Sequence, residues 1–312
     1  MTGPLPEGGL GEDNRQDNCV NKAPLPKPGG FSLKAIFAFL LAASLAIIWL
    51  TVAHELDRRK SADLREARLS TVFQAQAAAE NTLSLIKRLN EILLDLRTRW
   101  DGDPRRFGEI VRHRQGYMAD VAFQIAVIDK DGWLAFSNLG APKERMFLGE
   151  REHFRVHAGK DDHLFISKPL LGKVSGKWSI QMTRRINKPD GSFGGVVVIS
   201  VDPFYFSDFY RGVDLGRGGV VSLVGADGIV RARRAGDDAS VGQNLSSSPL
   251  MKRMAQTPSG SYRVASAADG VTRFYSYRTL KEYPLTVVVG VEETEALAPF
   301  VARRRGYLIY VL

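Results

Sequence analysis

The sequence lacks the residues and motifs on which several protein classes depend. Its single cysteine, Cys19, makes an intramolecular disulfide impossible and leaves the redox compartment open. The glycine-rich segment 216–219 has no Lys-Ser/Thr ending of a phosphate-binding loop and is interpreted as a turn. No Ser-His-Asp or paired-carboxylate arrangement with supporting context is visible. We therefore predict no catalytic residue and do not expect the chain itself to be an enzyme.

Acidic residues are the scarcer charged type. The chain has 34 Asp and Glu against 43 Lys and Arg, a formal net charge of +9. Nucleic-acid-binding proteins gather such an excess in a basic patch, whereas here the basic residues are spread through helical and strand-like segments. We therefore expect no nucleic-acid partner.

Formal charges are absent from the nineteen residues Ala35–Ala53. At about 1.5 Å per residue this run reaches about 30 Å, the thickness of a bilayer core. The alternative is a cleaved signal peptide, for which Thr51-Val52-Ala53 offers small residues at a cleavage site. The long preceding tail and the length of the apolar run favour an uncleaved anchor. We predict a transmembrane helix over residues 34–54, with an orientation that the flanking charges do not decide.

The two ends of the chain flank this anchor and the folded part. Residues 1–33 are rich in proline and glycine and poor in large apolar groups, which predicts a disordered tail, placed in the cytoplasm. At the other end Arg303–Arg305 precede the uncharged residues 306–312, which reach only about 10 Å at helical rise. We interpret residues 292–312 as a helix returning to the membrane and the start of a truncated second transmembrane helix.

Glycine and proline are absent from residues 54–100. Apolar residues recur there every seven positions, and three of them are followed by another apolar residue three positions later. The stripe consists of Val72, Ala75, Ala79, Ile86, Leu89, Leu93, Leu96 and Trp100. It predicts a long helix, followed by a short one that starts at Asp103-Pro104, together residues 55–118. The stripe can pack on its own domain or form a dimer seam, and we expect a homodimer through this helix.

After residue 120 the pattern changes to strands, and one unit occurs twice. Two hairpins with Asp-Gly turns are predicted, one at Val121–Ser137 and one at Val220–Arg233. Further strands are expected at His163–Leu170, Lys177–Ile186, Phe193–Val201, Gly260–Ser266, Thr272–Thr279 and Leu285–Val291. A short helix in the aromatic run 204–210 would join the copies. The predicted fold class is α+β, with two antiparallel-sheet lobes over residues 119–212 and 213–291.

This layout resembles the double Cache family, also called PDC or PAS-like sensor domains, of bacterial chemoreceptors, sensor kinases and diguanylate cyclases. The resemblance covers about residues 54–305 and is closest to the versions in diguanylate cyclases. Besides the long helix and the hairpins, it is carried by Gly149–His157, Leu164–Pro169, Ser175–Gln181, Thr183–Ile186 and Gly194–Pro203. It implies a periplasmic sensor with a membrane-distal first lobe, which holds the ligand pocket, and a membrane-proximal second lobe.

Double Cache sensors for amino acids carry a Tyr, Arg, Trp, Tyr and acidic pattern that holds the ligand's carboxylate and amine. By this resemblance Arg151 matches the family's Arg, Phe154 an aromatic position and Asp202 the acidic position. His153 replaces the Trp, and Met146 falls where the first Tyr is expected. The resemblance therefore implies a carboxylate or another anion as the ligand more than an amino acid.

Arg151 is the strongest site candidate, because a planar guanidinium holds a carboxylate through two parallel hydrogen bonds. Its alternative role is that of a solvated arginine at a helix start. Residues of the following strands would wall the same pocket, and Gln181 shares a strand face with Arg185; Trp178 can instead be a packing residue. The predicted ligand-binding residues are Arg151, His153, Phe154, Lys168, Trp178, Gln181, Arg185 and Asp202.

His153 and His157 are four positions apart, so a helix would place them on one face, where a metal could bridge them. Phe154 stands where the zinc-peptidase signature requires Glu, which excludes that class. We favour hydrogen-bonding histidines near a ligand over a metal site, and predict no metal and no cofactor. A membrane-anchored periplasmic metal-binding protein or enzyme that uses this pair is the alternative.

Together these features predict a periplasmic region that senses a small organic anion. It would belong to a bacterial transmembrane signalling protein of the inner membrane and form the input part of a diguanylate cyclase or a sensor histidine kinase. A structural module that binds no ligand and mediates assembly is a further alternative.

Overall fold

The computed structural model describes residues 32–116, 121–140, 144–159, 161–208 and 215–311. Contacts divide the chain into two units, Met1–Val52 and Ala53–Leu312, and each unit is described by itself. The predicted disordered tail lies outside the described residues except for its last two positions. Phe209 and Tyr210 of the predicted linking helix also lie outside them.

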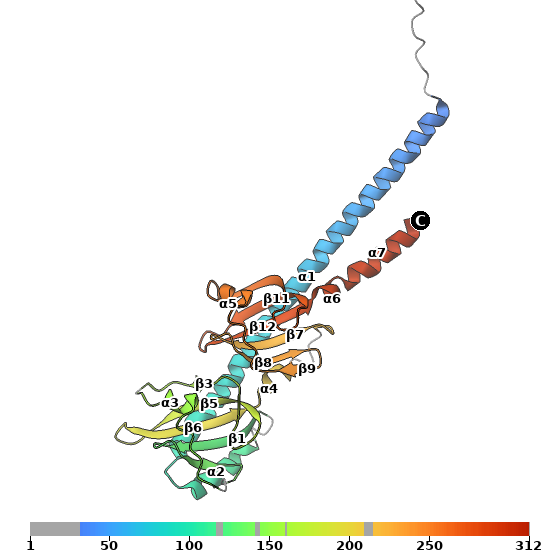
Figure 1. Ribbon diagram of the computed structural model, residues 1–312. Helices are drawn as coiled ribbons and strands as arrows, with labels where there is room; N and C mark the ends of the chain where they lie inside the picture. Colours follow the sequence, from blue (N-terminus) through green and yellow to red (C-terminus); the bar gives the residue numbers. More distant parts are fainter. Residues whose placement is uncertain (1–31, 117–120, 141–143, 160, 209–214, 312) are drawn as a thin grey trace, which may run out of the picture. The chain divides into compact units, whose positions relative to one another are not determined.

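Helix α1 runs from Leu33 to Arg99 without a break (Figure 1). The uncharged run and the heptad stripe therefore belong to one helix, because no glycine or proline separates them. Within the part of the chain that the structure describes, α1 is the one helix long and apolar enough to cross a membrane. Large apolar side chains in its first third, Phe39 and Leu50 among them, are exposed.

After Ala53, α1 buries most of its heptad stripe in the chain's own core. The buried members are Ala75, Ala79, Ile86, Leu89, Leu93 and Leu96. Val72 is 39% exposed, and Trp100 is partly buried against Phe107 of α2. The stripe therefore packs on its own domain, and the dimer through this helix stays a prediction.

Helix α2 (Pro104–Gln115) starts where Asp103-Pro104 predicts it. The Asp103 carboxylate accepts a hydrogen bond from the backbone N–H of Arg105 at 2.9 Å, and proline needs no partner in the first turn. The cap and the proline together fix the start of this helix.

The first lobe is built on one antiparallel sheet. Its strands are β1 (Ala122–Asp129), β2 (Leu134–Ser137), β3 (Phe165–Ile166), β4 (Leu170–Leu171), β5 (Trp178–Asn187) and β6 (Phe193–Val201). Their order is β2-β1-β6-β5-β3, and β4 also pairs with β5. The strand expected at His163–Leu170 is two short pieces, because Pro169 cannot donate to the ladder.

The second lobe repeats this arrangement. Its strands are β7 (Val220–Gly225), β8 (Val230–Ala235), β9 (Asp238–Ser240), β10 (Ser259–Ala265), β11 (Thr272–Thr279) and β12 (Leu285–Glu292), in the order β10-β11-β12-β7-β8-β9. Strand β9 was not expected from the sequence. In both hairpins the Asp-Gly turn places its glycine, Gly132 or Gly228, at a positive φ that other residues avoid.

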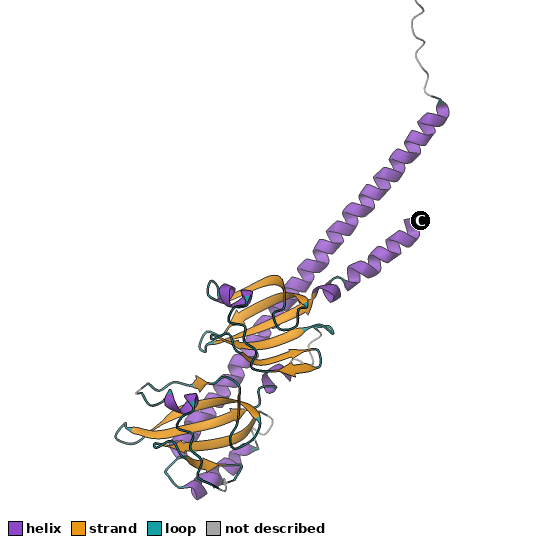
Figure 2. Cartoon of the chain, viewed as in Figure 1, coloured by secondary structure: helices purple, strands orange, loops and turns teal. Residues whose placement is uncertain are grey.

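Each sheet has two buried faces with different partners (Figure 2). One face of both sheets joins α1 in a single hydrophobic cluster that includes Ile86, Ile199 and Val287. The opposite, outer face of the first sheet packs against the segment around helix α3 (Glu152–Arg155). The outer face of the second sheet packs against α5 (Pro249–Met254). The outer faces are where each lobe can hold a small molecule.

Short helices follow the last strand of each lobe. Helix α4 (Tyr205–Asp208) follows β6 and is the described part of the predicted linking helix. The expected return helix is divided into α6 (Glu293–Ala296) and α7 (Ala298–Val311). Pro299 lies in the first turn of α7, where its missing N–H removes no helical hydrogen bond. The predicted α+β class with two antiparallel sheets and a long apolar N-terminal helix is confirmed.

Candidate ligand-binding site in the first lobe

A pocket of about 40 Å³ lies on the outer face of the first sheet. Its floor comes from β1, β5 and β6, and its cover from the segment that leads into α3 and from the loop after β4. It is lined by Gln124, Ala126, Ile128, Leu134, Leu148, Arg151, His153, Leu170, Gly172, Lys173, Val174, Gln181, Val198 and Ser200. Three of the predicted site residues, Arg151, His153 and Gln181, therefore share one pocket.

The edge of this pocket carries two cations and one anion. Arg151 is the residue before α3, and its side chain makes no capping hydrogen bond. Its Nε atom lies 3.6 Å from the Glu150 carboxylate, which also accepts a hydrogen bond from Lys173 Nζ. This hydrogen bond lowers the pKa of Glu150, so the carboxylate stays charged at neutral pH. The edge keeps one net positive charge, which favours an anion.

The floor of the pocket holds a polar network inside otherwise apolar strands. Ser200 Oγ donates to Gln181 Oε1 at 2.8 Å and lies 3.4 Å from Gln124 Oε1. The two amide groups in turn donate to serines, Gln124 Nε2 to Ser137 at 3.1 Å and Gln181 Nε2 to Ser179 at 2.8 Å. These contacts hold the two buried amides at the base of the pocket and fix their orientation.

His153 and His157 are both buried and lie in different surroundings. His153 lines the pocket, and its Nδ1 has no hydrogen-bond partner among the described residues. His157 lies beyond the end of α3, and its Nε2 is 2.9 Å from Thr183 Oγ1. Burial lowers the pKa of each to about 4, helped by the nearby charge of Arg151 at His153, so both rings are neutral at pH 7. No group of three metal-ligating side chains occurs in the described segments.

Four of the other predicted residues lie away from this pocket. Phe154 packs against Phe193 with ring centroids 5.5 Å apart. Lys168 Nζ is 3.9 Å from the Asp227 carboxylate in the second lobe. Trp178 is 50% exposed at the start of β5. The Asp202 carboxylate accepts a hydrogen bond from the backbone N–H of Phe204 at 2.9 Å, at the turn into α4.

Arg185 is buried beside the pocket and holds the segment after α3. Its Nη1 donates to the carbonyl oxygens of His157 and Gly159, both at 2.8 Å. Its guanidinium carbon lies 4.9 Å from the ring centre of Phe193. The predicted common face of Gln181 and Arg185 agrees with the burial of both. The predicted contact of Arg185 with a ligand stays a prediction.

Several pocket residues were missed by reasoning from the sequence. Gln124 and Ser200 could have been identified from the sequence, because each is a polar residue within an apolar strand. A polar residue in such a strand needs a buried hydrogen-bond partner. Glu150 and Lys173 gave no such signal, because each stands in a polar loop whose course the strand pattern does not define.

The comparisons with known proteins support this fold. A family profile, dCache_1_like, described as a histidine kinase sensor domain, matches residues 203–290. The extracellular domain of the histidine kinase rpHK1S-Z16 is 27% identical, with a TM-score of 0.66 over 75% of this chain and 98% of that one. The predicted resemblance to double Cache sensor domains is confirmed. No curated protein matches the chain.

Two chemoreceptors share the double Cache fold at lower identity. The ligand-binding domain of Pseudomonas fluorescens CtaA, solved with L-isoleucine, is 15% identical with a TM-score of 0.59, and covers 77% of this chain and 98% of its own. The sensory domain of Campylobacter jejuni Tlp3, solved with isoleucine, is 11% identical with a TM-score of 0.52, and covers 76% and 97%. The chain thus combines an extracellular type of sensor domain with an apolar helix that can anchor it in a membrane.

Proposed function

We propose that the first-lobe pocket binds a small organic anion through its carboxylate, with Arg151 as the main partner. The net positive edge formed by Arg151, Glu150 and Lys173 is the observation that carries this proposal. The ordered amides of Gln124 and Gln181 offer hydrogen bonds to the other end of the ligand. A space of about 40 Å³ suits a compact acid of few non-hydrogen atoms.

The proposed role of this binding is the input of a transmembrane signal. The chain would lie in a bacterial inner membrane, with the lobes in the periplasm and the first lobe distal to the membrane. The likeness to a histidine kinase domain at 27% identity supports a kinase as the output more than a diguanylate cyclase. A ligand changes the balance between two arrangements only by its different affinity for each, and α1 and α7 would carry that change. We propose that the signalling form is a homodimer through α1.

The site is tested by titrating the full chain, in detergent, with a panel of small organic acids and amino acids in a calorimeter. One acid should bind, and Arg151→Ala should weaken it by about 10- to 100-fold, since hydrogen bonds to charged groups contribute about 1.5–3 kcal/mol. Arg155→Ala is the matched control, because Arg155 is an exposed arginine of the same short helix that does not line the pocket. Unchanged binding in Arg151→Ala, or equal loss in Arg155→Ala, would contradict the site.

The orientation is tested with the single natural cysteine. In intact cells a membrane-impermeant maleimide should leave Cys19 unlabelled, because the tail is proposed to be cytoplasmic. The variant Cys19→Ser with Asp131→Cys should be labelled, since the Asp131 side chain is 64% exposed in the first lobe. The reverse labelling pattern would place the lobes in the cytoplasm and refute the proposed location.

A further inference from the structure

The second lobe has a pocket of its own, of about 50 Å³, on the outer face of its sheet. The floor is formed by Val220, Ser222 and Val224 of β7 with neighbouring strands, and the cover by α5, the segment before it and the loop after β10. This is the place in the repeated unit that corresponds to the first-lobe pocket. The profile of histidine kinase sensor domains matches this lobe and no residue of the first lobe's sheet. The match to sensor domains therefore rests on the second lobe.

The walls of this pocket are mostly apolar. They include Val220, Val224, Leu245, Leu250, Val264, Tyr275 and Val288. Among the serines that interrupt them, Ser222 and Ser248 are buried, at 7% and 8% exposed. The Ser248 Oγ atom is buried and has no hydrogen-bond partner among the described residues, and it does not cap the helix that follows. A buried hydroxyl without a partner costs about 1–3 kcal/mol, and a polar ligand atom would remove that cost.

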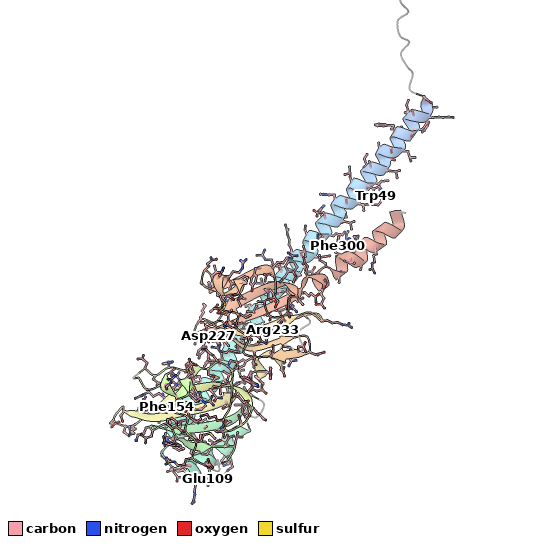
Figure 3. All side chains as sticks on the ribbon, in the orientation of Figure 1. Trp49, Glu109, Phe154, Asp227, Arg233 and Phe300 are labelled. Atoms are coloured by element: carbon pink, nitrogen blue, oxygen red, sulfur yellow. The ribbon has the colours of Figure 1, made fainter. Side chains whose placement is uncertain are left out.

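Positive charge is buried at one end of the pocket. Arg233 lines it and donates to the Asp269 carboxylate at 2.5 Å (Figure 3 labels Arg233). Arg273 donates to the other oxygen of Asp269 at 2.8 Å and to the carbonyl oxygen of Gly218 at 2.6 Å. The side chains of Arg233 and Arg273 are 9% and 3% exposed. One carboxylate thus serves two buried guanidinium groups, so Arg233, Arg273 and Asp269 together carry a net charge of +1.

We propose that this second-lobe pocket binds a short-chain monocarboxylate, with propionate as the representative. The carboxylate would lie between Arg233 and Ser248, where it balances the extra charge and accepts from the unpartnered hydroxyl. The alkyl group would lie among the valines and leucines of the sheet and α5. A space of about 50 Å³ takes roughly three to five non-hydrogen atoms, which sets the upper length of the chain. The site is separate from the anion pocket at Arg151.

The test uses the full chain in detergent with Arg151→Ala, so that anion binding in the first-lobe pocket is weakened. Calorimetric titration with sodium propionate should give one equivalent of binding. Propionamide, of equal size but uncharged, should bind at least tenfold more weakly, and octanoate should not bind because it is too long.

Ser248→Ala assigns this binding to the second-lobe pocket. It should weaken propionate binding about 5- to 10-fold without lowering the melting temperature, because the hydroxyl it removes has no partner in the free protein. Ser247→Ala is the matched control, since Ser247 is the exposed neighbour and does not line the pocket. Ser222→Val, which narrows the floor, should also weaken binding.

Three outcomes would overturn the proposal: no heat with propionate, equal affinity for propionamide, or binding that neither Ser248→Ala nor Ser222→Val changes. None of these outcomes bears on the first-lobe site, whose test is the effect of Arg151→Ala on its own ligand.

Discussion

The two lobes share one strand order but place their charges differently around equivalent pockets. In the first lobe, the charged side chains of Arg151, Glu150 and Lys173 stand at the pocket edge, where each is between 24% and 47% exposed. In the second lobe Arg233 and Arg273 are almost fully buried and share Asp269. The first arrangement leaves the folded state almost independent of the charges. The second makes the charges part of the core.

This difference shows how a duplicated fold can divide binding and stability between its copies. An exposed charged residue can be replaced to suit another ligand with little loss of stability, since exposed ion pairs contribute about 0–1 kcal/mol to folding. A buried pair cannot lose one partner without leaving the other unpaired, which costs about 3–5 kcal/mol. We therefore expect ligand preference to vary more freely in the first pocket than in the second.

Among single substitutions, the largest predicted effect comes from Asp269→Ala, which leaves Arg233 and Arg273 without their carboxylate. Because Asp269 is itself 27% exposed, we expect the lower end of the range, about 3 kcal/mol less free energy of unfolding. Glu150→Ala, the matched change in the first lobe, should cost less than about 1 kcal/mol. Urea unfolding of the full chain in detergent measures both, and equal costs would show that the second-lobe charges are not a core element.

The next effect is an acid sensitivity confined to the first lobe. Burial lowers the pKa of His153 and His157 from 6.5 to about 4, whereas residues 215–291 contain no histidine. Between these pKa values the unfolded chain binds more protons than the folded one, so stability falls as the pH falls from about 6.5 to about 4. The loss approaches about 1.4 kcal/mol per pH unit for each histidine.

Hydrogen exchange at pH 7 and pH 5 separates the two lobes. Peptides from β5 should lose protection at the lower pH, while peptides from β11 should keep it. In the double variant His153→Gln and His157→Gln the difference between the lobes should shrink. Equal loss in both lobes, or no change in the variant, would assign the acid sensitivity to other groups.

The smallest effect concerns the segments that follow the last strand of each lobe. The Glu295 carboxylate of α6 accepts hydrogen bonds from the backbone N–H groups of Arg217 and Gly218, before β7. Glu295→Gln should lower the melting temperature by the equivalent of about 1 kcal/mol, because the amide keeps one acceptor but loses the charge. Glu293→Gln is the control, since Glu293 pairs with the exposed Arg263 and should cost less than about 0.5 kcal/mol. A larger loss for Glu293→Gln would contradict this.

Much of the fold could be predicted because its signals are local. Apolar runs on either side of an Asp-Gly turn predicted both hairpins, and strands β6 and β11 begin and end where the sequence predicts. The three-residue β9 was missed, since Asp238–Ser240 carry no apolar pattern and pair only because β8 presents a free edge to them.

The candidate site could be predicted only in part. The alternation of β5 placed Gln181 on one face with Arg185, and the structure brings Gln181 and Arg151 into one pocket. Lys168 and Asp202 were expected in the pocket but contact Asp227 and the turn into α4 instead. Strand alternation defines the face that a residue occupies, but not the loop that covers that face.

The sequence by itself determined the long apolar helix and the duplicated α+β unit, because each depends on composition or on neighbours along the chain. Only the tertiary structure decided which residues meet in each pocket. Lys173 joins Glu150 and Arg151 from the loop after β4, and Arg233 of β8 joins Asp269 and Arg273 from the other side of the second sheet's strand order. Such contacts arise from how segments distant in sequence pack, and no local pattern records them.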